Sequence, residues 1–244
     1  MSPTMRIRYE CVDGIGSIRL DDGRANAIQA EWCAEMAAAL DEAARDASRV
    51  IVVTGRPGFF CGGLDLKVLP RLDPAALRAT TDVFLATMRR LFLFEKPLIA
   101  ASAGHAIAGG MMLMLCADLR LAVDETQSRY GMNEAVTGIP LTGGTLGICT
   151  SQIPSAHHTE LILHGRLVDA RGALARGMLD ELTEEDRLVE RAHSRARELF
   201  DLDLGAYRLN KRMLRESAFV EAARAGAALV GSLPVGNVFA GIAR

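Results

Sequence analysis

The most apolar stretch of the chain lies in its middle, between Lys96 and Ala122. From residue 97 to residue 117 it contains no charged residue, and only His105 can acquire a charge near neutral pH. A proline and paired glycines interrupt the stretch, so we expect it to fold in pieces rather than to span a membrane. The expected pieces are a buried strand at residues 98–102, a turn at 103–108, an apolar helix at 109–117 and a second strand at 119–123.

Hydrophobic periodicity predicts further elements on both sides of this stretch. Residues 7–12 and 15–20 flank Asp13-Gly14, a dipeptide typical of tight hairpin turns, and predict two antiparallel strands. The β-branched run at residues 50–54 predicts a strand covered on both faces. Residues 55–69 are expected to form a loop and then a helix. Apolar positions at helical spacing predict helices at residues 32–44, 74–94, 169–177, 184–200, 204–217 and 219–230.

Composition limits the classes of function that fit this chain. Half of its 244 residues are hydrophobic, and 28 basic residues stand against 30 acidic ones without a basic block, so nucleic-acid binding has little support. The five scattered cysteines show no metal-ligand spacing, so we expect reduced thiols and no metal site. The N-terminus lacks the apolar segment of a secretory signal, and a cytoplasmic protein without a membrane partner is expected.

Two glycine pairs are candidate parts of a catalytic site. Gly62-Gly63 and Gly109-Gly110 each follow a predicted buried strand and loop, so the same order of strand, loop and glycine pair occurs twice in the chain. Two such loops can each present a backbone N–H to one oxygen atom, which is the geometry of an oxyanion hole. The alternative is that the glycines only allow a helix and a sheet to approach closely.

Glu134 is the second candidate, because its neighbours are mostly apolar. Apolar surroundings disfavour the charged form of a carboxyl group and raise its pKa toward the range that is useful for proton transfer. The alternative is an exposed glutamate that is stabilised at the N-terminus of a helix.

Three segments in order resemble the crotonase (enoyl-CoA hydratase/isomerase) superfamily: FFCGGLDLK, KPLIAASAGHAIAGGMMLMLCADLRLA and RYGMNEAVTGIP. The resemblance extends from the first hairpin to about Lys211. It implies an α/β fold in which residues 1–190 form a right-handed spiral of ββα units. Residues 191–244 would be a helical region of the same domain that mediates a homotrimer or a dimer of trimers.

The resemblance also implies an acyl-CoA thioester as substrate and no separate cofactor. It places the oxyanion hole at the N–H groups of Gly62 and Gly109. The residues that it places at the CoA moiety are Ala25, Asp65, Leu66 and Lys211.

One position departs from the hydratase pattern. Hydratases of this family use two glutamates, and here the first of these positions holds Met112 while Glu134 occupies the second. A methionine has no titratable proton, so isomerisation of a 3-enoyl-CoA to a 2-enoyl-CoA by Glu134 alone is expected. A weak or atypical hydratase and an acyl-CoA-binding protein without catalysis remain the alternatives. His105, just before the helix, either tunes Glu134 in the pocket or is structural.

Overall fold

Two β-sheets form the centre of the structure, a computed structural model that describes residues 5–141 and 143–232. The larger sheet has the strand order β1-β2-β3-β5-β7-β9, and the smaller has the order β4-β6-β8. The strands are β1 (Ile7–Val12), β2 (Ile15–Leu20), β3 (Val50–Thr54), β4 (Gly58–Cys61), β5 (Leu98–Ser102), β6 (Gly104–Ile107), β7 (Leu119–Val123), β8 (Tyr130–Gly131) and β9 (Glu181–Thr183).

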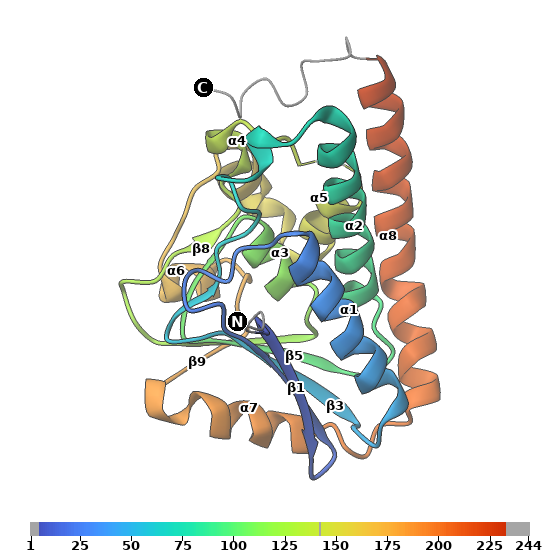
Figure 1. The fold of residues 1–244 in the computed structure, drawn as a ribbon. Coiled ribbons are helices and arrows are strands. Elements are labelled where there is room, and N and C mark those ends of the chain that lie inside the picture. The colour runs from blue at the N-terminus through green and yellow to red at the C-terminus, as the bar shows by residue number, and fades with distance from the viewer. Residues whose placement is uncertain (1–4, 142, 233–244) are drawn as a thin grey trace.

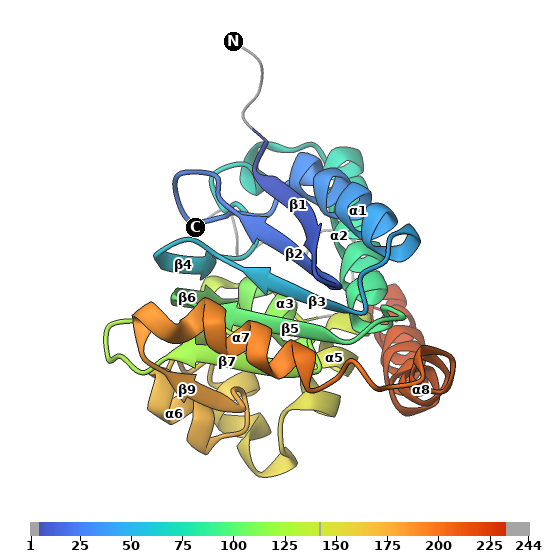
Figure 2. The ribbon, with the colours of Figure 1, turned by 90° about the horizontal axis from the view of Figure 1, so that it is seen from below.

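Successive strands alternate between the two sheets. β3, β5 and β7 each lie in the larger sheet and are followed by β4, β6 and β8 in the smaller one. All strand pairs are parallel except the β1–β2 hairpin, in which Val12 pairs with Ile15 across the Asp13-Gly14 turn. Each turn of the chain therefore adds one strand to each sheet, as the expected spiral of ββα units requires (Figure 2).

Helices cover both faces of the larger sheet (Figures 1 and 2). Val50 and Val52 of β3 belong to the apolar cluster under α7, whereas Ile51 and Val53 belong to the main core on the opposite face. This alternation is what a strand buried on both faces requires. The helices are α1 (Ala30–Arg45), α2 (Pro74–Phe92), α3 (Gly109–Leu115), α4 (Glu134–Thr137), α5 (Gly143–Gln152), α6 (Ala170–Ala175), α7 (Leu188–Arg197) and α8 (Leu204–Ser232).

Helix α8 runs along one side of the molecule beside α2 and α5 (Figure 1). Gly144 and Gly147 of α5 lie so close to Phe219 and Ala218 of α8 that a side chain at either glycine would collide with them. The sequence predicted two helices, at residues 204–217 and 219–230, and this was wrong because one helix continues through both ranges. The last residues of the expected C-terminal region, 233–244, lie outside the described part of the chain.

Three other predictions, for the segments around the two glycine pairs, were also wrong. The loop that was expected to begin at residue 55 contains β4, and the expected turn at 103–108 contains β6. After Gly63 the chain forms a turn and a single 3-10 turn at Leu69–Arg71, not a helix. Strands of four residues are too short to show a periodic pattern, and their pairing partners are distant in sequence. Among the described residues, no helix is both long enough and apolar enough to cross a bilayer.

Candidate active site

The N-terminus of α3 provides one set of hydrogen-bond donors. Ala108, directly before the helix, has φ of 54°, a conformation that costs energy in a residue with a side chain. Its carbonyl oxygen accepts hydrogen bonds from the N–H groups of Met111 and Met112. The N–H groups of Gly109 and Gly110 have no hydrogen-bond partner within the described residues. They are therefore available to a bound group.

The loop after β4 provides a second donor, but it is not the predicted one. The N–H of Gly62 donates to the carbonyl oxygen of Ala25 at 2.8 Å, so Gly62 cannot serve the oxyanion hole in this conformation. The free donor is Leu64, whose N–H has no partner in the part of the chain that the structure describes. A Cβ atom placed on Gly63 would lie 3.0 Å from the Gly109 nitrogen, so the two loops meet at this point.

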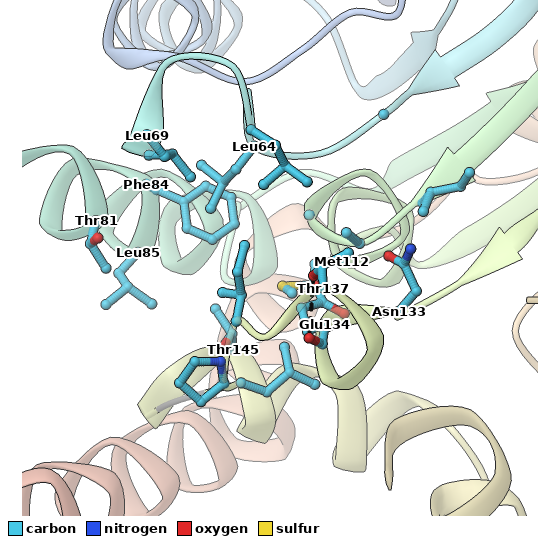
Figure 3. A pocket seen from close by; sticks show the side chains of 18 of the residues that line it. Leu64, Leu69, Thr81, Phe84, Leu85, Met112, Asn133, Glu134, Thr137 and Thr145 are labelled. Atoms are coloured by element: carbon cyan, nitrogen blue, oxygen red, sulfur yellow. Dashed lines mark hydrogen bonds between the residues drawn. The ribbon is translucent and has the colours of Figure 1, made fainter. Parts of the chain in front are cut away.

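The N–H groups of Leu64 and Gly109 adjoin a pocket with a volume of about 130 Å³. Figure 3 shows Met112, Asn133 and Glu134 at one end of this pocket and Thr81 and Leu85 at the other. The side chains and backbone that line it are mainly aliphatic: Gly62, Leu64, Leu66, Leu69, Leu77, Thr81, Phe84, Leu85, Ile107, Ala108, Gly109, Met112, Asn133, Glu134, Thr137, Ile139, Pro140, Leu141 and Thr145.

Glu134 begins α4 and points into this pocket (Figure 3). Only 4% of its surface is exposed, and neither carboxylate oxygen has a hydrogen-bond partner among the described residues. Burial disfavours the charged form and raises the pKa of Glu134 to about 7. The prediction of a buried glutamate with a raised pKa is confirmed. Such a group can accept and return a proton near neutral pH.

Met112 on α3 also lines the pocket and is 3% exposed. The only ionisable side chain that lines the pocket, within residues 5–141 and 143–232, is Glu134. Asn133 adds an amide next to it, and the Thr137 hydroxyl donates to the Glu134 carbonyl oxygen at 3.2 Å. The pocket therefore offers one proton carrier rather than two.

Ala25 and Asp65 shape the site without lining it. The Asp65 carboxylate accepts hydrogen bonds from Gln29 at 2.7 Å and from the Lys67 N–H at 2.9 Å. Partial burial by itself would raise the pKa of Asp65, but these hydrogen bonds outweigh it and lower the pKa. Leu66, in contrast, lies on the pocket wall and is 45% exposed, so it can contact a ligand that extends toward solvent.

Lys211 is almost fully buried in this chain. Its side chain, on α8, is 3% exposed and forms an ion pair with Asp118 at 2.8 Å. Burial lowers the pKa of Lys211, while the neighbouring Asp118 opposes this shift. The role near the CoA phosphates, often those of a neighbouring subunit, stays a prediction for Lys211. Its positive charge is balanced by the Asp118 carboxylate inside the protein.

His105 also lies outside the pocket. It is half-buried on β6, where its Nδ1 accepts a hydrogen bond from the Arg129 N–H at 3.0 Å. Its ring packs against Phe59, with 4.9 Å between the ring centroids. These contacts support the structural alternative, and the pocket assignment was wrong.

Comparisons with known proteins agree with this architecture. The sequence model of a family described as enoyl-CoA hydratase/isomerase matches residues 10–228. Carnitinyl-CoA dehydratase of Proteus mirabilis is 34% identical over 182 residues, which cover 73% of this chain and 68% of that protein. The mitochondrial enoyl-CoA delta isomerase 1 of Rattus norvegicus is 27% identical over 206 residues, which cover 84% of this chain and 71% of that protein.

Solved structures of enoyl-CoA isomerases and hydratases have a similar fold. The structure of an enoyl-CoA isomerase of Mycobacterium tuberculosis has a TM-score of 0.85 and 29% identity, and the match covers 96% of this chain and 100% of that one. An enoyl-CoA hydratase of Bacillus anthracis is also similar, so hydratase and isomerase names both occur among the similar proteins.

Proposed function

The chain belongs to the enoyl-CoA hydratase/isomerase family, and from this premise we propose that it converts 3-enoyl-CoA into 2-enoyl-CoA with Glu134 as its single proton carrier. The observation that carries this proposal is the combination of one buried carboxyl group and two unpaired backbone N–H groups around one pocket. The substrate class follows from the family, in which acyl-CoA thioesters are expected.

The N–H groups of Leu64 and Gly109 would hold the thioester oxygen. When a proton leaves C2, negative charge develops on this oxygen, and fixed donors stabilise that charge more than the neutral carbonyl. Removing one donor of this kind typically costs about 3 kcal/mol of transition-state stabilisation.

The proton transfer needs only Glu134. Its carboxylate takes a proton from C2, and the electron pair of the C2–H bond forms the enolate with its charge on the thioester oxygen. When the enolate collapses, a double bond forms between C2 and C3, and the former C3–C4 double bond takes the proton from Glu134 at C4. The carboxylate is regenerated, and the double bond has moved into conjugation with the carbonyl.

The same arrangement is poorly suited to hydration. Addition of water needs one group to activate the water and another to protonate carbon. The first glutamate of the hydratase pattern is replaced by Met112, which has neither a titratable proton nor a strong acceptor. The isomerase name of the rat protein supports this preference by similarity.

We also propose that α8 contacts further copies of the chain in a trimer or a dimer of trimers. Leu209, Met213 and Leu214 support this proposal because they are large apolar side chains that are mostly exposed on α8.

The reaction can be tested by supplying 3-enoyl-CoA and 2-enoyl-CoA separately and following the absorbance of the conjugated thioester. The proposal expects a rise with the first substrate. A fall with the second substrate and no rise with the first would make the protein a hydratase. Tight binding of both without any absorbance change would leave a binding protein.

Glu134→Gln keeps the size of the side chain and removes the base. We expect the isomerisation rate to fall by at least the ~10²-fold that is typical of general acid–base groups, while acyl-CoA affinity changes little. Glu185→Gln, at an exposed position away from the pocket, is the matched control and should keep the wild-type rate. Unchanged turnover in Glu134→Gln would remove this residue from the mechanism.

A further inference from the structure

Strand β1 forms one edge of the larger sheet. The strand order places it at the end of that sheet, and β2 is its only partner strand within the described residues. Figure 2 shows β1 at the outer end of the sheet and α8 on another side of the molecule. A strand in this position presents unpaired N–H and C=O groups, with which another strand can pair.

The free backbone groups of this edge belong to Tyr9 and Cys11. The Arg6 carbonyl oxygen accepts a hydrogen bond from the Asp21 N–H at 2.8 Å, so Arg6 faces β2. Because every second residue of an antiparallel strand faces the same neighbour, Tyr9 and Cys11 face away from β2. Their backbone groups have no hydrogen-bond partner within the part of the chain that the structure describes. The edge is therefore open at these two residues.

The beginning of the edge is closed by Glu35 of α1. Its carboxylate accepts hydrogen bonds from the N–H groups of Arg6 at 2.8 Å and of Ile7 at 2.9 Å. Hydrogen bonds to a further strand are therefore expected around Tyr9 and closer to the hairpin turn.

The charges on both sides of Tyr9 are unbalanced within the chain. Arg19 pairs with Asp21 at 3.6 Å, whereas the exposed Arg8 and Glu10 have no ion-pair partner among the described residues. Arg8 also lies directly opposite Arg19 in the β1–β2 pair, and like charges at opposite positions destabilise a sheet. A strand that brings a carboxylate to Arg8 and a cation to Glu10 would complement both residues.

We propose that β1 pairs with β1 of a second copy of this chain, in antiparallel register, with the twofold axis at Tyr9. In this register the Tyr9 N–H of each copy donates to the carbonyl oxygen of the partner's Tyr9. Arg8 lies opposite the partner's Glu10, and Glu10 lies opposite the partner's Arg8. These are the positions between hydrogen-bonded pairs, where Cα atoms approach to about 4.5 Å and side chains are closest.

This contact is separate from the surfaces used elsewhere in the protein. It uses the same strand in both copies, so it closes after two copies. An assembly held together by α8 would therefore join a second such assembly through β1. Arg8 and Glu10 do not line the pocket, so the contact does not depend on the isomerase reaction.

Charge reversal tests this register through the mass of the assembly, measured by sedimentation equilibrium in low-salt buffer. Glu10→Arg sets arginine against arginine at both ends of the contact, and Arg8→Glu sets glutamate against glutamate. We expect each variant alone to associate through β1 at least about tenfold more weakly than the wild type. At a concentration where the wild type is paired, each variant should then have half the wild-type mass.

A mixture of the two variants tests the pairing of these charges directly. A chain with Arg8→Glu complements a chain with Glu10→Arg at both positions, so the mixture should regain the wild-type mass. This recovery also shows that both variants are folded. Glu185→Arg makes the same change of charge at an exposed position beyond β9, the opposite edge of the sheet, and should keep the wild-type mass.

Two results would overturn the β1 contact. Equal masses of the wild type and Glu10→Arg would mean that β1 does not join copies of the chain. A loss of mass in both variants that mixing does not restore would mean that Arg8 and Glu10 do not pair in this register. Neither result depends on turnover, so failure of the isomerase assay would contradict only the proposed function.

Discussion

At the scale of single residues, Glu134 shows how a buried group can combine a stability cost with a chemical use. Its carboxylate lies among Met112, Ile139 and other apolar groups, and neither oxygen is hydrogen-bonded within the described residues. A solvated glutamate would be ionised and a poor acid at neutral pH. Burial brings its pKa to about 7, where both protonation states are accessible.

The pH dependence of the reaction should follow this residue. Isomerisation begins with ionised Glu134, so kcat/KM should rise with pH through an apparent pKa of about 7 and level off above it. Initial rates measured from pH 5 to pH 9 with a 3-enoyl-CoA would show this profile. A profile that is already flat at pH 5.5 would mean that the base is a group with an ordinary carboxyl pKa.

Protein stability should show the opposite dependence on pH. Because the pKa of Glu134 is higher in the folded state than in the unfolded chain, the folded state retains the proton while the unfolded chain ionises. Below the ordinary glutamate pKa there is no penalty, and stability is lost as pH rises through 7, by an amount on the order of 3 kcal/mol.

Urea unfolding at pH 5 and at pH 8 isolates this contribution. The wild-type protein should lose more unfolding free energy between these values than Glu134→Gln, which cannot ionise at this position. Comparing the two differences cancels the cost of burying the glutamine amide. Equal differences in both proteins would show that Glu134 does not titrate differently on folding.

At the scale of elements, the contact between α3 and β4 sets the position of the oxyanion donors. Gly110 packs directly against the Cys61 backbone at the end of β4, and Gly63 lies against Gly109. These close approaches bring the N-terminus of α3 beside the loop that carries the Leu64 N–H. The glycines therefore allow the close packing that also places the proposed oxyanion donors, so the two interpretations that the sequence left open are compatible.

Gly110→Ala should disturb this contact. Its Cβ atom would lie 1.9 Å from the Cys61 carbonyl oxygen, far less than the van der Waals contact distance, so the backbone must move, and we expect a loss of about 3 kcal/mol in unfolding free energy.

Gly109→Ala is the control, and only its unfolding free energy is compared with that of Gly110→Ala. Its Cβ atom would meet Phe84 at 3.3 Å, which a small side-chain shift can relieve, and we expect a change within about 1 kcal/mol. Equal stabilities of the two variants in urea unfolding would contradict the tight α3–β4 contact.

At the scale of the whole molecule, one buried ion cluster ties α8 to the spiral. Asp118 accepts hydrogen bonds from the Leu98 N–H and from Lys211, and its other oxygen pairs with Arg215 at 3.0 Å. Arg215 also donates to the carbonyl oxygens of Phe92 and Cys116. The C-terminal helix is thus joined to the chain just after α3, which carries the oxyanion site.

Asp118→Asn should loosen this connection. The substitution leaves two buried cations without their counter-charge, and breaking a buried pair in this way costs about 3 kcal/mol or more. The measurement is urea unfolding at neutral pH. Asp124→Asn, which removes an exposed pair with Arg171, is the control and should change stability little. If both variants were equally stable, the Asp118 cluster would not anchor α8.

The sequence by itself determined most of the long elements, the family and the buried glutamate of the candidate site. The β1–β2 hairpin, α1, β3 and α2 follow from local periodicity, because each buries a regularly spaced set of its own residues. The ordered motifs identified the family, and the apolar neighbours of Glu134 indicated a raised pKa. Met112 could also be recognised as a departure, since residue identity is all that this inference requires.

Only the tertiary structure decided which groups are free to act. Strands β4, β6 and β8 exist because of partners far along the chain, and the Gly62 N–H is unavailable because Ala25 accepts it. The charge of Lys211 is likewise paired with Asp118, which lies 93 residues earlier in the chain. Hydrogen bonds and ion pairs between distant segments leave no local pattern, so the availability of a donor or a charge depends on how the chain folds back on itself.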